Sequence, residues 1–135
     1  MSTSKVNYLG NLRTEATHLQ SGTKIITDAP VDNNGKGEAF SPTDLVATSY
    51  ASCMLTIIGI FCVNNDLKFE HGSANVTKVM GTAPRRISEI HIEMDLKGNG
   101  WNEKEQEQVT RAAKACPVAH SVHDEILIVI DFTFA

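Results

Sequence analysis

The sequence has few of the residues that build extracellular or nucleic-acid-binding proteins. It holds only three cysteines in 135 residues, and this small, odd number does not predict a framework of structural disulfides. Its basic residues are scattered singly apart from Arg85 and Arg86, and the formal net charge is −4. Because no continuous basic stripe is available for phosphate backbones, nucleic acid is not an expected partner. Repeats and low-complexity tracts are also lacking, which indicates a compact soluble fold.

The chain also lacks the pattern of an exported protein. Residues 1–8 contain no basic segment followed by an apolar one, which a secretory signal requires. We therefore expect a cytoplasmic protein. In that reducing compartment, the cysteines are buried, bound to metal or catalytic rather than joined in structural disulfides.

One long stretch without charge, residues 45–63, is about long enough to cross a bilayer. Its polar residues, such as Thr48 and Ser52, and the acidic Asp44 and Asp66 at its flanks argue against a membrane span. We expect a buried central helix and no membrane partner. Because this helix would be apolar nearly all round, protein must cover it on all sides, from the same chain or from a second subunit.

The order of the elements predicts an α+β fold in a single domain over residues 1–135. Three short strands and a polar loop precede a long helix, and a hairpin, a second helix and a strand follow. The last strand is so apolar that we expect it in the covered centre of a sheet, since an open edge would aggregate. The predicted strands are residues 5–9, 12–19, 23–28, 74–80, 90–96 and 126–134; the predicted helices are 42–64 and one that Asn102 and Glu105 open with a capping box.

Cysteine chemistry decides the candidate site, because the thiolate is the nucleophile. Cys116 precedes Pro117, which interrupts the second helix and favours a new helix start, where unpaired N–H groups stabilise a thiolate. Cys53 lies about three turns inside the long helix, where burial favours the neutral thiol unless the fold supplies a cation. From the residues alone, Cys53 and Cys62 are typical of small core residues. For Cys116, a core role and a reactive role are about equally expected.

Two motifs that contain these cysteines resemble the paired signature of the OsmC/Ohr family. The first is Ser41-Pro42-Thr43-Asp44-Leu45-Val46-Ala47 leading to Ala51-Ser52-Cys53-Met54, and the second is Ala115-Cys116-Pro117-Val118. The order of the predicted elements is similar to that of the family over nearly the whole chain. The resemblance implies antiparallel sheets around two central helices in an intertwined homodimer, with active sites at the interface. A second subunit would then supply the cover that the long helix needs.

The resemblance also implies a thiol-dependent peroxidase. Cys53 would attack an organic hydroperoxide, release an alcohol and become a sulfenic acid. Cys116 would then condense with it to a disulfide, which a dithiol reductant, expected to be a lipoylated protein, would reopen. In the family an arginine from the N-terminal strands stabilises the thiolate, and Arg13 matches it best. No cofactor is expected.

One position departs from the family pattern. Where the hydroperoxide reductases have a glutamate after the helix-start proline, which orients the arginine, this chain has Thr43. Asp44, one position later, and Glu38, in the preceding loop, are the candidates to replace that charge. The departure keeps open a non-catalytic OsmC-like protein that senses redox state or binds a ligand.

A metal-binding module is the third alternative. His120 follows Cys116 by four residues, so that both would share a helical face, and with Cys53 they could form a soft site for zinc or copper(I). We favour a metal-free site, with His120 as a partly exposed residue.

Overall fold

The computed structural model describes residues 1–135, the whole of the sequence, and divides into two compact units, Met1–Val46 and Ala47–Ala135. The long helix α1, Pro42–Asn64, begins in the first unit and continues in the second. Each unit carries one three-stranded sheet. The α+β class is therefore confirmed, while the expectation of a single domain stays a prediction.

The first unit is an antiparallel meander. Its strands are β1 (Ser4–Gly10), β2 (Arg13–His18) and β3 (Lys24–Asp28), in the sheet order β1-β2-β3, and a short 3-10 helix, η1 (Val31–Asn33), follows. Tight connections join the strands, so the sequence separation fixes the register. As a result, Arg13 at the start of β2 lies opposite Asp28 at the end of β3.

The first unit buries no large apolar side chain. Its fully covered residues are polar, namely Thr27, Asp28 and Ser41. By contrast, apolar side chains such as Val6 (60% exposed) and Tyr8 (67%) are left open. A unit of this size needs an apolar core to be stable by itself, so this sheet depends on cover from outside the unit.

Helix α1 begins where the sequence predicts. The Ser41 hydroxyl accepts a hydrogen bond from Asp44 N–H at 3.0 Å, and the Asp44 carboxylate accepts one from Ser41 N–H at the same distance. This reciprocal pair is a capping box, which satisfies two of the N–H groups that a helix start leaves unpaired. Asn102 and Glu105 form the second predicted box at the start of α2, Glu103–Lys114.

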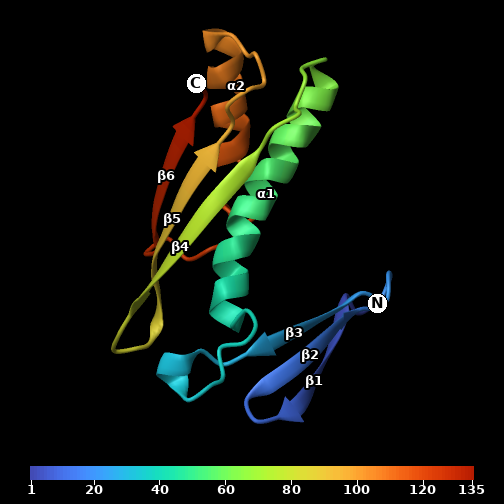
Figure 1. Cartoon of the computed structure of the whole chain (residues 1–135), viewed down its shortest axis with the longest axis vertical. Helices are drawn as coiled ribbons and strands as arrows, with labels where there is room; N and C mark the ends of the chain where they lie inside the picture. Colours follow the sequence, from blue (N-terminus) through green and yellow to red (C-terminus); the bar gives the residue numbers. More distant parts are fainter. The chain divides into compact units, whose positions relative to one another are not determined.

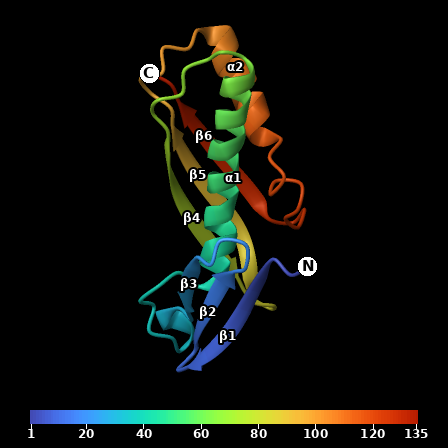
Figure 2. The same cartoon turned by 90° about the vertical axis from the view of Figure 1, so that its right-hand side faces the viewer.

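The second unit packs both helices on one face of a mixed sheet. The strands β4 (Ser73–Gly81) and β5 (Arg86–Asp95) form the predicted hairpin, and β6 (Leu127–Thr133) joins β5 in parallel. Ile90, Ile92 and Met94 of β5, with Leu96 just after the strand, share one core with the buried residues of α1 and α2. Figures 1 and 2 show both helices beside the sheet of β4, β5 and β6. Because every second residue of a strand points to the same face, the strict alternation in the sequence already predicted this arrangement.

Two expectations about the second unit were wrong in detail. The sheet order is β4-β5-β6, so the apolar β6 lies at an edge of the sheet rather than at its centre, and this sheet is not wholly antiparallel. No helix starts at Pro117 either: residues 117–121 form successive turns, with His120 N–H donating to Pro117 C=O at 3.2 Å and Ser121 N–H to Val118 C=O at 3.0 Å.

Helix α1 is long and apolar enough to cross a membrane by length and composition alone, a test that core helices of soluble proteins also pass. Within this chain it is covered on one face, by way of Tyr50, Met54 and Ile58. Ile60 and Val63 near its end are 52% and 79% exposed. An apolar helix needs protein on all sides, and a single copy of the chain covers α1 only in part.

Candidate functional site

The second unit brings the two motif cysteines together. Cys53 projects from the middle of α1 and is partly exposed, whereas Cys116 follows the end of α2 and is fully buried. The Cys53 side chain is close enough to raise the pKa of the Cys116 thiol, and both thiols are free. Two thiols that lie this close, one of them accessible, are the arrangement in which a sulfenic acid on one can condense with the other.

The surroundings of Cys116 act on its acidity in opposite directions. Burial raises the pKa of the Cys116 thiol, and the hydrogen bond and charge of Cys53 raise it further. The N–H groups of Ala119 and Val118 lower the pKa, and the former lies 3.4 Å from the Cys116 sulfur. Thus the turn after Pro117 directs N–H groups at the sulfur as a helix start would, although it is not a helix. Burial has the larger effect, so Cys116 is held as a neutral thiol.

Tyr50 is a residue of this site that the sequence analysis missed. It lies one turn before Cys53 on α1, a spacing that places both on one side of the helix, and it is 5% exposed. Burial raises the pKa of its hydroxyl, and the charges of Cys116 and Cys53 add to that effect. The sequence signal for Tyr50 was its position three residues before Cys53 in a predicted helix.

Cys62 stands apart from this pair. It is 1% exposed in the apolar core, and burial alone raises the pKa of its thiol. Both features are typical of an inert structural cysteine. The interpretation of Cys62 as a core residue is therefore supported.

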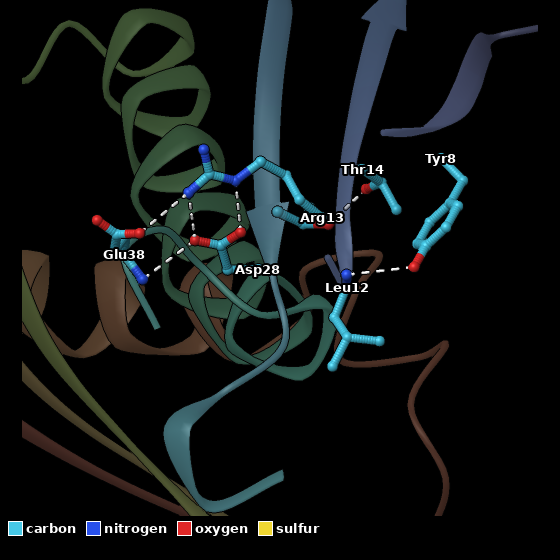
Figure 3. Close-up of polar contacts among 7 residues, drawn as sticks. Tyr8, Leu12, Arg13, Thr14, Asp28 and Glu38 are labelled. Carbon is cyan, nitrogen blue, oxygen red and sulfur yellow. Dashed lines mark hydrogen bonds and ion pairs between the residues drawn. The ribbon is translucent and has the colours of Figure 1, made fainter. Parts of the chain in front are cut away.

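The first unit holds a cluster of three charged side chains (Figure 3). Arg13 Nε donates to Asp28 Oδ1 at 2.7 Å, and Arg13 Nη2 donates to Asp28 Oδ2 at 2.8 Å, which makes a bidentate ion pair. Arg13 Nη2 also lies 3.5 Å from Glu38 Oε1. The hydrogen bond from Arg13 lowers the pKa of Asp28 against the opposing effect of burial, and Asp28 in turn raises the pKa of Arg13.

Of the two acids expected to orient Arg13, Glu38 forms this weaker contact, and Asp44 serves in the capping box of α1. The principal partner is Asp28, which the sequence analysis missed. The signal was present in the hairpin register, because strands joined by a tight turn after His18 place Arg13 and Asp28 opposite each other.

The structure offers little support for the third alternative, a metal-binding module. His120 is exposed, and no three His, Cys, Asp or Glu side chains come together in a group that could hold a metal ion. Zinc in a structural site takes about four such ligands.

The sequence matches the model of the family described as OsmC-like protein over residues 35–131. The structure is similar to that of a protein from Psychrobacter arcticus 273-4, provisionally described as an osmotic stress induced and detoxification response protein, with a TM-score of 0.93 and 53% identity over 98% of this chain and 96% of that one. No curated protein matches the sequence.

Two more distant structures share the fold. An organic hydroperoxide resistance protein from Legionella pneumophila is 18% identical, with a TM-score of 0.73 and 98% of each chain covered. One from Elizabethkingia anophelis is 14% identical, with a TM-score of 0.75 over 100% of this chain and 98% of that one.

Proposed function

Because the chain belongs to the OsmC-like protein family, we propose that it is a thiol-dependent peroxidase that reduces organic hydroperoxides to alcohols. The observation that carries the proposal is that two free thiols, Cys53 and Cys116, are neighbours in one unit, where Cys53 raises the pKa of Cys116. Distant structural relatives named as organic hydroperoxide resistance proteins agree with this class of substrate. The compartment we propose is the cytoplasm.

In the first step, the Cys53 thiolate attacks the terminal oxygen of the hydroperoxide. A sulfur–oxygen bond forms while the oxygen–oxygen bond breaks, so that sulfur is oxidised to a sulfenic acid and the peroxide is reduced. The alkoxide leaves and takes up one proton to become the alcohol. Partial exposure admits the substrate to Cys53, whereas Cys116 is closed to it.

In the second step, the Cys116 sulfur attacks the Cys53 sulfur, and water leaves. The disulfide that forms is reopened by thiol exchange with a dithiol, which is oxidised in turn; a lipoylated protein is our expectation for this partner. The raised pKa of Cys116 suits this order of events, because a neutral thiol does not compete with Cys53 for peroxide. When the disulfide forms, the Cys116 proton passes to the hydroxide that leaves the Cys53 sulfur, and water is released.

In the proposal, Arg13 supplies the permanent positive charge that favours the thiolate form of Cys53. A guanidinium stays protonated at any physiological pH and presents several N–H donors in one plane. Its ion pair with Asp28 further raises its pKa. In the proposal Arg13 stabilises the Cys53 thiolate and the oxygen that leaves it, as the corresponding arginine does in the family.

We also propose that the active form is a homodimer. The first unit lacks buried apolar side chains of its own, and α1 leaves Ile60 and Val63 open. Burial of such surface stabilises an assembly by about 25 cal/mol per Å², and a second copy of the chain is the partner that covers both features. A dimeric mass in sedimentation equilibrium is the expected result, and a monomer at micromolar concentration would contradict this part of the proposal.

The test of the peroxidase is turnover of cumene hydroperoxide with dihydrolipoamide as the reductant. Wild-type protein should consume peroxide catalytically, Cys53→Ser should be inactive, and Cys62→Ser should match wild type because Cys62 lies outside the pair. Equal turnover by Cys53→Ser and wild type would refute the proposal.

The second candidate function is a redox sensor or ligand-binding protein without turnover. Thr43 favours it, because this residue stands where the family's reductases carry a glutamate. For that function the Cys53–Cys116 disulfide would form with one equivalent of peroxide, but added dithiol would not sustain further consumption. The same assay therefore separates the two candidates.

A further inference from the structure

Asp28 is the most completely buried charged side chain of the first unit, at 1% exposed. Removing a carboxylate from water is unfavourable unless hydrogen bonds and an opposite charge replace its hydration. Asp28 receives such replacements from three N–H donors: two of Arg13, and the backbone N–H of Glu38 at 3.1 Å. The carboxylate is thus fixed from two sides, by a strand and by the loop that carries Glu38.

This fixed carboxylate determines how the Arg13 guanidinium lies. Two parallel hydrogen bonds to one carboxylate hold the guanidinium in a set plane and prevent rotation about its last bonds. Asp28 engages the edge formed by Nε and Nη2. In Figure 3 the remaining nitrogen, Nη1, points away from both acids. Arg13 is 35% exposed, so this nitrogen is available to another acceptor.

Glu38 cannot hold the guanidinium in the same way. Its side chain is 63% exposed, and its carboxylate makes a single contact, at 3.5 Å, with a nitrogen that Asp28 already engages. Exposed pairs of this kind contribute little, because water and salt screen them. Its backbone N–H matters more than its side chain, since it supports Asp28.

We propose that Asp28 is the positioning residue of Arg13 and takes the part that the family's helix-start glutamate plays elsewhere. The inference rests on the proposed function, in which Arg13 stabilises the Cys53 thiolate. Asp28 touches neither the sulfur nor the peroxide. It acts by holding Nη1 of Arg13 in one orientation through an ion pair between two neighbouring strands.

The first experiment measures kcat/KM for cumene hydroperoxide with Asp28→Asn, which keeps the shape but removes the charge. A misdirected catalytic group costs about 10- to 100-fold, and we expect a loss in that range. Glu15→Gln is the matched control, because Glu15 forms an ion pair with Lys24 at 3.7 Å in the same sheet; it should leave the rate unchanged. A rate for Asp28→Asn equal to that of wild type would overturn the proposal.

The second experiment separates positioning from mere stability. Arg13→Ala removes the group on which Asp28 acts, so Asp28→Asn should not lower the rate further in that background. Added methylguanidinium should partly restore Arg13→Ala, because Asp28 can bind it, but should not restore the double variant. An equal further loss in the Arg13→Ala background, or equal rescue of both variants, would show that Asp28 is only structural.

Folding and function are controlled separately. Circular dichroism shows whether Asp28→Asn is folded; if it is not, Asp28→Glu, which retains the charge but displaces it by one methylene, is measured in its place and should show a smaller loss. If wild type itself does not turn over, the proposed function fails. Positioning is then measured by the rate at which iodoacetamide alkylates Cys53. Asp28→Asn should slow this rate, and an unchanged rate would contradict the positioning role of Asp28.

Discussion

In the loop between β5 and α2, the Asn99 side chain binds the segment that precedes β4, and its removal gives a sharp test of the structure. Asn99 is 9% exposed. Its oxygen accepts from the backbone N–H groups of Glu70 and His71 at 2.9 and 3.0 Å. Its nitrogen donates to the carbonyls of His71 and Leu96 at 2.7 and 2.9 Å. A single amide therefore satisfies four backbone groups.

The expected cost of Asn99→Ala follows from these four bonds. Each contributes about 0.5–1.5 kcal/mol net, and a buried group left without a partner costs about 1–3 kcal/mol. Water can replace part of the loss because Glu70 and His71 are exposed. We expect the free energy of unfolding to fall by about 2–4 kcal/mol, which corresponds to a fall of about 1–2 M in the urea midpoint.

The assay is equilibrium urea unfolding at a fixed protomer concentration, because dimerisation would add to stability. The single tryptophan, Trp101, reports on the same loop, since its indole N–H donates to the Lys68 carbonyl at 2.7 Å. Asn75→Ala, on the exposed side of β4, is the control and should change stability little. A loss below about 1 kcal/mol for Asn99→Ala, less than a single average hydrogen bond, would refute the reasoning.

Three further predictions concern the thiols and the helix start. The pKa of Cys62 is raised in the folded protein. Its contribution to the free energy of unfolding is therefore fully present below its ordinary pKa and is lost as the pH rises above about 8.5. The free energy of unfolding of Cys62→Ser should depend less on pH above about 8.5 than that of wild type. Ser41→Ala removes the hydroxyl that caps Asp44 N–H and should lower the free energy of unfolding by about 1 kcal/mol in urea. Cys116→Ser should accumulate a sulfenic acid on Cys53 that dimedone labels, and an unlabelled Cys53 would contradict the resolving role of Cys116.

Elements whose residues interact locally were predictable from the sequence. The capping boxes at Ser41 and Asn102 and the alternation along β5 depend on residues within a few positions of one another. Such signals are complete within a short stretch of chain. They predicted the start of α1 and α2 and the buried face of β5 correctly.

Elements that depend on distant partners were not predictable in the same way. The sequence of β6 is apolar enough for a central strand, but its position beside β5 alone is decided by the sheet topology. The apolar residues of an edge strand and those of a central strand look alike in a single sequence. In the same way, Pro117 indicated a break after α2 but not that turns would follow it.

The site was predictable in part. The motifs singled out Cys53 and Cys116, and the family resemblance singled out Arg13. The structure brings the two thiols together and pairs Arg13 with acids. The acid that engages Arg13 most strongly, Asp28, lies fifteen residues away in sequence and is reached through the hairpin. The expectation was drawn instead to Asp44 and Glu38, because both are close to the helix start where the family carries its glutamate.

The most direct test of the Cys53–Cys116 redox pair is titration of the reduced protein with one equivalent of cumene hydroperoxide, followed by a free-thiol count and peptide mapping. We expect Cys53 and Cys116 to be joined in a disulfide while Cys62 keeps its thiol. Recovery of both Cys53 and Cys116 as free thiols in excess peroxide would contradict this expectation.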